Sequence, residues 1–95
     1  MSQDRDLGLG VIGAGYWGKN VVRNFDRVEG ARLVGVADLV ERNRDRAKAA
    51  HPQIHCYEQH ADLLARDDVH AVAICTGAAA HHAVARDALL AGKDV

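Results

Sequence analysis

Residues 11–18 read Val-Ile-Gly-Ala-Gly-Tyr-Trp-Gly, and the rest of the chain is organised around this stretch. Its glycines, Gly13, Gly15 and Gly18, have the spacing G-x-G-x-x-G. Nine glycines in 95 residues produce such spacings by chance, so the pattern gains meaning only from its surroundings. It indicates a nucleotide-binding turn when a strand precedes it, a helix follows it and an acidic residue stands about 20 positions further on.

The chain meets all three of these conditions. Residues 7–12 are apolar and uncharged, as in a strand buried on both faces of a parallel sheet. Residues 19–28 carry apolar side chains at intervals of four and three, which predicts a helix with one apolar face. Asp38 ends a second apolar run, residues 32–38, twenty positions after Gly18. The context therefore favours a dinucleotide-binding unit.

The remaining segments continue the alternation of strands and helices. We expect a charge-rich helix over 40–50, a strand over 54–57, a helical turn over 61–65, a strand over 69–76, a helix over 80–91 and the start of a fifth strand at 93–95. Such alternation predicts an α/β fold, a Rossmann-type doubly wound parallel sheet with helices on both faces. Right-handed crossovers and a reversal after the first strand give the order 3-2-1-4-5. We expect residues 1–95 to be one dinucleotide-binding domain, cut off at the start of strand five.

Composition excludes several classes of protein. A net charge of -1 lacks the basic excess of a nucleic-acid binder. The polar N-terminus has no apolar signal-peptide core, and no run approaches the roughly 18 apolar residues of a membrane span. Two cysteines, Cys56 and Cys75, imply no disulfide framework. We expect a cytoplasmic protein with neither a nucleic-acid nor a membrane partner.

Each glycine of the motif has a separate expected role. Gly13 turns the chain out of the first strand, Gly15 lets the pyrophosphate of a dinucleotide approach the backbone, and Gly18 lets the helix pack closely on the strand. The first-turn amides and the positive end of the helix dipole then bind the phosphate charge. Tyr16 and Trp17, inside the same loop, are included among the cofactor-binding residues.

Asp38 has two interpretations. An acid at the end of the second strand accepts hydrogen bonds from ribose hydroxyls and repels a 2'-phosphate, which favours NAD over NADP. Asp38 and Glu41 also have the spacing of a capping box, with Asp38 as the N-cap. The two interpretations are compatible. Arg42 is placed to accept a 2'-phosphate, so NADP stays possible.

Thr76 and Gly77 follow the fourth strand, whose carboxyl end lies beside that of the first strand in this topology. Ligands bind in the crevice outside those ends, so we expect Thr76, Gly77 and the loop through Ala80 to border the inner ribose of the cofactor. An ordinary strand-to-helix turn is the alternative. His81 begins the last predicted helix and lacks a visible catalytic partner, so a cofactor contact or a loop-fixing role is expected.

Metal binding is not predicted. The six histidines include one compact group, His55-Cys56 with His60, whose spacing matches no zinc pattern. No residue of this segment is assigned a catalytic role.

The assembled motifs resemble the Gfo/Idh/MocA oxidoreductases, which include glucose-fructose oxidoreductase and inositol dehydrogenase. The resemblance runs from about Leu7 to Val95 and rests on residues 11–20, Val36-Ala37-Asp38, residues 73–76 with His81, and residues 91–95. It implies an N-terminal Rossmann domain that binds NAD(P) and a C-terminal α/β domain that supplies substrate contacts and the oligomer interface. Hydride would pass between the nicotinamide and a sugar, sugar acid or polyol; residues 16–20 look like members that oxidise nucleotide-sugars or sugar acids.

Two departures accompany the resemblance. Gly77 stands where the family commonly has proline, and a glycine there loosens the loop. The family's Glu-Lys-Pro motif, with its catalytic lysine, would follow within a few residues of Val95, so the resemblance implies that this segment alone is inactive. Lys93 belongs to the preceding Gly-Lys turn and does not replace that lysine.

Two other classes of function stay open from the sequence. One is a nucleotide-binding module that senses a ligand without catalysis. The other is an S-adenosylmethionine-dependent methyltransferase, although such enzymes usually carry an acid in the first strand, where this chain has Val11-Ile12.

Overall fold

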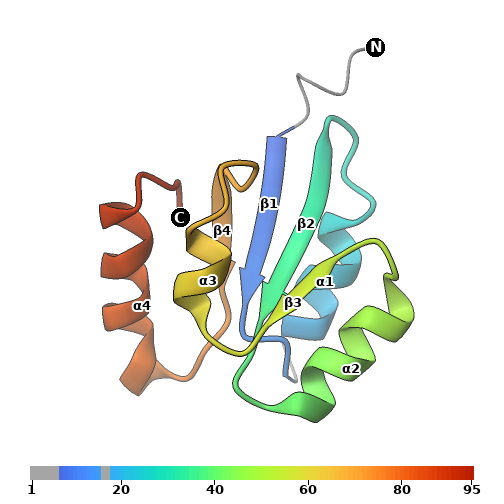
Figure 1. Cartoon of the computed structure of the whole chain (residues 1–95), viewed down its shortest axis with the longest axis horizontal. Coiled ribbons are helices and arrows are strands. Elements are labelled where there is room, and N and C mark those ends of the chain that lie inside the picture. Colours follow the sequence, from blue (N-terminus) through green and yellow to red (C-terminus); the bar gives the residue numbers. More distant parts are fainter. Residues whose placement is uncertain (1–6, 16–17) are drawn as a thin grey trace.

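The computed structural model describes residues 7–15 and 18–95. Strands and helices alternate along the described chain: β1 (Leu7–Ile12), α1 (Gly18–Phe25), β2 (Ala31–Ala37), α2 (Glu41–Ala50), β3 (His55–Tyr57), α3 (His60–Leu64), β4 (Ala71–Ile74) and α4 (Ala78–Leu90). Figure 1 shows the strands side by side in the centre of the molecule with helices around them. The predicted alternation is confirmed.

The sheet is parallel and has the order β3-β2-β1-β4 (Figure 1). Asp94 adds a single parallel bridge to Ala71 on the outer edge of β4. Its carbonyl accepts from the amide of Val72 at 2.8 Å, and its amide donates to the carbonyl of His70 at 3.0 Å. The predicted order 3-2-1-4-5 is therefore confirmed for the four strands, and Asp94 lies where strand five was expected.

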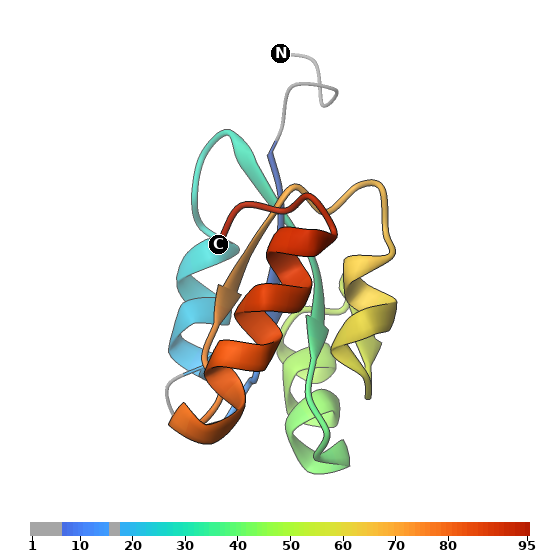
Figure 2. The same cartoon turned by 90° about the vertical axis from the view of Figure 1, so that its left-hand side faces the viewer.

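Each face of the sheet has its own apolar core. On one face, Val22 of α1 and Ala47 of α2 pack with Val11, Leu33 and Ile54. On the other face, the helices α3 and α4 cover a separate cluster of buried side chains: Ile12, Val34, Ala37, Leu63, Leu64, Val69, Val72, Val84 and Ala88. Figure 2 shows α1 and α3 on opposite sides of the strands. Two covered faces explain why the strands read as continuous apolar runs.

A bulge in β2 adjusts which side chains reach each face. Leu9 pairs with Leu33, whereas the next residue, Gly10, pairs with Gly35, so Val34 is an extra residue in β2. Such an insertion bends and twists the strand locally. Leu33 and Val36 consequently reach the same core although they are three positions apart.

Helix boundaries differ from the sequence expectation by more than one residue at two places. Helix α1 ends at Phe25, and Val28, predicted to lie on its apolar face, is 48% exposed. The amides of Arg27 and Val28 bond to carbonyls three residues back, which closes the helix in a tighter turn. Helix α4 begins at Ala78 instead of Ala80, because residues 78–80 are all alanine, the strongest helix former.

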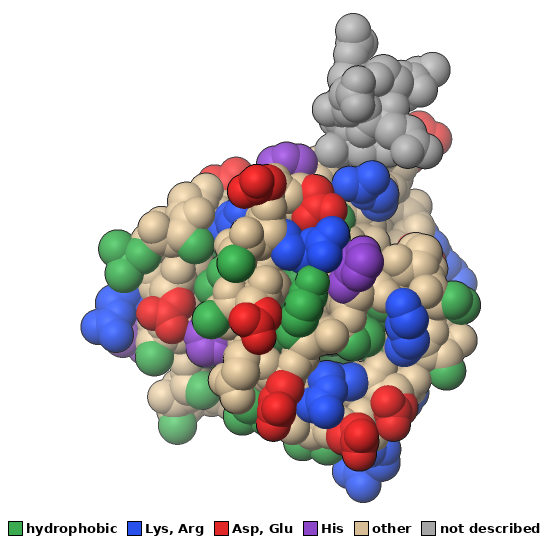
Figure 3. Space-filling view, in the orientation of Figure 1, with side chains coloured by type: hydrophobic (Ala, Val, Ile, Leu, Met, Phe, Trp, Pro, Cys, Tyr) green, Lys and Arg blue, Asp and Glu red, His purple; other side chains and the backbone are tan. Residues whose placement is uncertain are grey.

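The surface carries charges of both signs. On the face seen in Figure 3, acidic and basic side chains are interspersed, and neither sign forms a continuous field. Among residues 7–15 and 18–95, no helix is long and apolar enough to cross a membrane.

Candidate nucleotide-binding site

A crevice of about 480 Å³ lies where the carboxyl ends of β1, β2 and β4 meet. Five of the residues predicted from sequence are in or beside it: Gly13 and Gly15 from the loop after β1, Asp38 after β2, and Thr76 and Gly77 after β4. Parallel strands bring their carboxyl ends to one edge, which explains how residues more than 60 positions apart converge.

The glycine loop has the backbone that its sequence predicts. Gly13 has φ of 93°, and a Cβ on it would lie 2.9 Å from the carbonyl carbon of Cys75. A Cβ on Gly18 would lie about 2 Å from the backbone oxygen of Gly13. At Gly15, by contrast, the nearest atom of the described residues would be the side-chain nitrogen of Asn43 at 3.8 Å. The described part of the chain therefore leaves space above Gly15, as a phosphate approaching this backbone requires.

Tyr16 and Trp17, also predicted to bind the cofactor, lie outside the described residues. Gly18 is buried as the first residue of α1, so the loop leads directly into a helix N-terminus. That arrangement presents backbone amides and the positive end of the helix dipole to an anion.

Asp38 is held through its backbone and its carboxylate. Its amide donates to the carbonyl of Tyr57 at 2.9 Å, and its carbonyl accepts from Arg44 Nη1 at 2.9 Å. Its Oδ2 accepts from the amide of Ala14 at 2.7 Å, and its Oδ1 from the amide of Val40 at 2.8 Å. Asp38 therefore joins the end of β2 to the glycine loop.

The capping-box interpretation of Asp38 is wrong. The N-cap of α2 is Val40, with no side-chain hydrogen bond, and Glu41 is the first helical residue. Asp38 instead bonds the amide two residues on, a local turn that aspartate favours. Because the helix starts later than the capping box requires, the carboxylate does not cap α2, and its Oδ2 accepts from the glycine loop.

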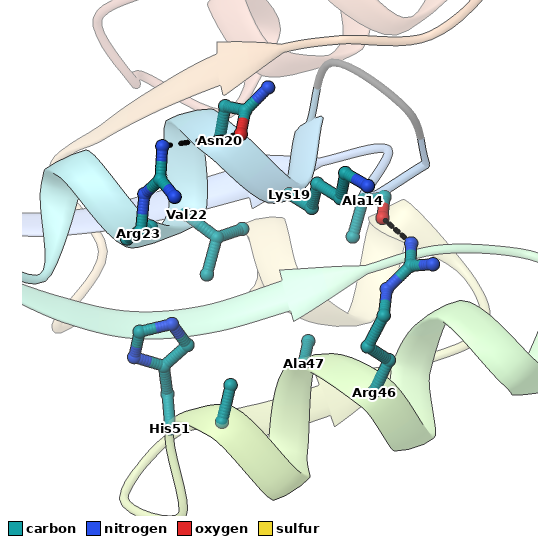
Figure 4. Close-up of a pocket in the computed structure, with 9 residues that line it drawn as sticks. Ala14, Lys19, Asn20, Val22, Arg23, Arg46, Ala47 and His51 are labelled. Atoms are coloured by element: carbon teal, nitrogen blue, oxygen red, sulfur yellow. Dashed lines mark hydrogen bonds between the residues drawn. The ribbon is translucent and has the colours of Figure 1, made fainter.

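Sequence reasoning missed two side chains of α2 beside Asp38. Asn43 Nδ2 lies 3.3 Å from each carboxylate oxygen of Asp38. Arg46 Nη2 donates to the carbonyl of Ala14 at 2.9 Å, and Figure 4 shows its side chain reaching from α2 to that loop. Their spacing of three is a helical signal, but a charge-rich helix gives no reason to select these two. Arg42, the predicted 2'-phosphate partner, is exposed and does not line the crevice.

The β4 side of the crevice is arranged differently. Thr76 Oγ1 is buried and has no hydrogen-bond partner in the described part of the chain. Gly77 is the N-cap of α4 and makes no side-chain cap. Burial also raises the pKa of the Cys75 thiol, which lies just below Thr76 in the same wall. A buried hydroxyl without a partner is unfavourable, so a polar ligand group here would satisfy it.

His81 is not among the residues that line the crevice. It lies exposed in the first turn of α4, where its amide donates to the carbonyl of Gly77 at 3.1 Å. Because α4 starts at Ala78, His81 does not begin the helix as expected, and Ala80 borders the crevice. His60 lines the crevice and contacts Asp87 at 2.9 Å, a pairing that no sequence spacing indicated.

These residues fit a dinucleotide. Gly15, a carboxylate at the end of β2 and the Thr76 hydroxyl lie along one crevice, and α1 begins three residues after Gly15. Phosphates, a ribose diol and a further polar group are the chemical complements of these features. Among the described residues, no group of three or more His, Cys, Asp or Glu side chains could hold a metal ion.

Fold and crevice together define a Rossmann-type nucleotide-binding domain. Residues 7–95 match a family model described as oxidoreductase family, NAD-binding Rossmann fold, the Gfo/Idh/MocA family. The chain belongs to this family as its NAD-binding Rossmann domain. The resemblance drawn from sequence is confirmed.

Curated relatives include two kinds of protein. The chain is 37% identical over 100 residues to glycosyl hydrolase family 109 protein 2 of Shewanella sp. (strain ANA-3), covering 93% of this chain and 21% of that protein. It is 36% identical over 91 residues to inositol 2-dehydrogenase of Burkholderia multivorans, covering 94% of this chain and 27% of that protein. The chain thus spans about a quarter or less of the length of these relatives.

Solved structures give the same result for the fold. Scyllo-inositol dehydrogenase from Lactobacillus casei, with bound NAD(H) and scyllo-inositol, superposes with a TM-score of 0.86 at 27% identity, over 93% of this chain and 26% of that one. GenD2 from gentamicin A biosynthesis, in complex with NAD, superposes with a TM-score of 0.87 at 26% identity, over 94% of this chain and 25% of that one.

Proposed function

We propose that this chain is the cofactor-binding domain of a longer NAD-dependent oxidoreductase that acts on a polyol or a related sugar. When bound, the nicotinamide would supply hydride-acceptor chemistry toward a hydroxyl-bearing carbon of the substrate. The residues of this chain bind and orient the cofactor: Gly13, Gly15 and Gly18 shape the loop, and Asp38 accepts from the ribose hydroxyls. Tyr16, Trp17, Thr76, Gly77 and His81 stay proposed contacts.

The observation that carries the proposal is the placement of Asp38 beside the glycine loop. Its carboxylate accepts from the amide of Ala14, the residue between the first two glycines of the motif. A negative charge at that point favours ribose hydroxyls over a 2'-phosphate, so we propose NAD as the preferred cofactor over NADP.

Catalytic groups, substrate contacts and the oligomer interface are proposed to lie in a C-terminal α/β domain. The relatives of which this chain covers about a quarter support a longer protein. A homo-oligomer and a cytoplasmic location stay predictions. Membership of an oxidoreductase family favours this function over the methyltransferase.

Titration of the full-length protein with NADH, followed by nucleotide fluorescence, tests cofactor binding. We expect saturable binding by the wild type and its loss in Gly15→Val, because the added side chain fills the open space above the loop. Binding that is absent from the wild type, or unchanged in Gly15→Val, would overturn the proposal.

Inositols are the first substrates to assay, because an inositol 2-dehydrogenase and a scyllo-inositol dehydrogenase resemble this chain. Reduction of NAD by an inositol would support a polyol dehydrogenase. Glycoside hydrolysis is the second candidate, favoured by the similarity to glycosyl hydrolase family 109 proteins. Release of a sugar from a glycoside, without net reduction of NAD, would favour it.

A further inference from the structure

Four residues close a ring of hydrogen bonds beside the crevice. The amide of Ala14 donates to Asp38 Oδ2 at 2.7 Å, and Asn43 Nδ2 approaches both oxygens of that carboxylate at 3.3 Å. Arg46 Nη2 then donates to Asn43 Oδ1 at 3.1 Å and to the carbonyl of Ala14 at 2.9 Å. We call these residues, Ala14, Asp38, Asn43 and Arg46, the loop ring. It joins the glycine loop, the end of β2 and helix α2.

The loop ring crosses a region that apolar packing does not fill. A groove of about 550 Å³ runs between α1 and α2, and Ala14, Arg46 and Ala47 line it. Figure 4 shows Arg46 reaching across to Ala14 at one end of this groove, with Lys19 of α1 directed toward the same loop. Ala14 and Ala47 share the buried core on this face, and the hydrogen bonds of the loop ring add to that packing in setting the position of the loop relative to α2.

The arrangement of the loop ring leaves the negative charge of the Asp38 carboxylate unpaired by Arg46. Among the ion pairs of the described residues, none joins Arg46 to Asp38. The neutral amide of Asn43 lies between them and contacts both side chains. A direct arginine partner would offset the negative charge that repels a 2'-phosphate, whereas Asn43 orients the carboxylate without neutralising it.

We propose that Asn43 and Arg46 are positioning residues that fix Asp38 and the glycine loop for NAD and thereby set the preference for NAD over NADP. The inference rests on the proposed function. Asn43 is half-buried and acts on the carboxylate directly; Arg46 is exposed and acts through Asn43 and the carbonyl of Ala14. Asn43 therefore contributes more than Arg46.

Dissociation constants of the full-length protein for NADH and NADPH test the proposal. We expect Asn43→Ala to raise the Kd for NADH about tenfold, and Arg46→Ala about threefold. In Asn43→Ala the ratio of the NADPH Kd to the NADH Kd falls, because the carboxylate is no longer held toward the ribose. Arg46→Lys, which keeps a donor, restores part of the NADH affinity. Asn43→Ser replaces Asn43→Ala if thermal unfolding shows that the alanine variant does not fold.

Two controls separate positioning from other effects. Arg42→Ala removes a charge from the same helix and should leave the Kd for NADH unchanged; an effect equal to that of Arg46→Ala would overturn the role of Arg46. In an Asp38→Ser background, whose short side chain cannot reach Asn43, Asn43→Ala should have no further effect.

The remaining outcomes are also decisive. Equal rises in both dissociation constants, or a full effect of Asn43→Ala in the Asp38→Ser background, would overturn the inference while the proposed function stands. A wild-type protein that binds neither nucleotide would overturn both.

Discussion

The two walls of the crevice are built in opposite ways. On the β2 side, the carboxylate of Asp38 already accepts hydrogen bonds from amides of Ala14, Val40 and Asn43 within the protein, and its two oxygens keep acceptor capacity for a ribose diol. On the β4 side, the buried hydroxyl of Thr76 has no partner among the described residues, and the N-cap of α4 is Gly77, which has no side chain to cap the helix.

This difference indicates which part of the site forms before the ligand arrives. Hydrogen bonds within the protein preorganise the β2 wall, so binding there loses little conformational entropy. The β4 wall keeps an unsatisfied polar group, whose cost a ligand removes. Substitutions on the β2 wall should therefore lower both the stability of the free protein and its affinity for nucleotide. Substitutions on the β4 wall should lower the affinity without lowering the stability.

The largest effect on stability and binding is expected from substitution of Gly18, on which both walls depend. Gly18→Ala places a Cβ against the backbone oxygen of Gly13, and neither backbone segment can give way cheaply. We expect a loss of about 3 kcal/mol or more in the free energy of unfolding, together with loss of NADH binding. A Cβ in Gly15→Ala would lie no closer than 3.8 Å to any atom of the described residues, so this variant should fold normally while it weakens binding. Urea unfolding of both variants measures this; equal stabilities would contradict the structure.

Asp38→Ala should destabilise the free protein as well as weaken binding. The amide of Ala14, whose residue is 1% exposed, loses its acceptor, which costs about 1–3 kcal/mol. Affinity for NADH should fall at least about tenfold because the ribose hydroxyls lose the carboxylate. Thermal unfolding without nucleotide, followed by NADH titration, separates the two effects. A variant as stable as the wild type would show that the β2 wall is not preorganised.

Thr76→Val should give the reverse result. Valine has nearly the same shape but lacks the buried, unpartnered hydroxyl, so stability without nucleotide should be unchanged or higher by about 1 kcal/mol. Affinity for NADH should fall about tenfold if the hydroxyl bonds the cofactor. The same two measurements apply. A loss of stability in the absence of nucleotide would show that Thr76 has a structural partner instead.

The sequence predicted the sheet because its signals are local and mutually consistent. Apolar runs, turn glycines and right-handed crossovers are enough to specify the order β3-β2-β1-β4. Helix ends were less predictable, since Ala78 and Ala79 read equally well as loop or helix until Gly77 is seen as the N-cap. The bulge at Val34 leaves no signal in an uninterrupted apolar run.

The structure places Gly13, Gly18 and Asp38 where the sequence predicted, because their positions depend on the backbone; their roles toward the cofactor stay predictions. A side chain at Gly13 or Gly18 would clash with the backbone, so only glycine fits there. The position of Asp38 follows from its place at the end of β2. Asn43 and Arg46 could not be found, because their roles depend on the side-chain geometry between α2 and a loop about 30 residues away. Thr76 was found by position, but the absence of a partner for its hydroxyl is a property of packing.

Gly77→Pro should stiffen the open β4 wall. Gly77 has φ of -63°, which is the value proline imposes, and a Cβ there would meet no atom of the described residues within 4 Å. We expect a gain of about 0.4–1 kcal/mol in the free energy of unfolding, because the unfolded chain loses conformational freedom. The matched control is Gly92→Pro, where φ of 80° is incompatible with proline and stability should fall. A destabilised Gly77→Pro would mean that the backbone around Thr76 excludes the ring.

The smallest effect is expected for the alkylation rates of the two cysteines, which test whether NADH covers the β4 wall. Burial raises the pKa of both thiols, and for Cys56 the charges of Lys48 and Arg44 partly offset the shift. Both thiols therefore stay protonated to a higher pH than a free cysteine, so alkylation should be slow at neutral pH and accelerate as the pH rises.

Cys75 lines the crevice, whereas Cys56 Sγ lies against the carbonyl of Arg44, 3.7 Å away. NADH should slow alkylation of Cys75 severalfold and leave Cys56 unchanged, as peptide mass spectrometry of the two sites would measure. Equal protection of both thiols would indicate that NADH stabilises the whole domain instead of covering the β4 wall.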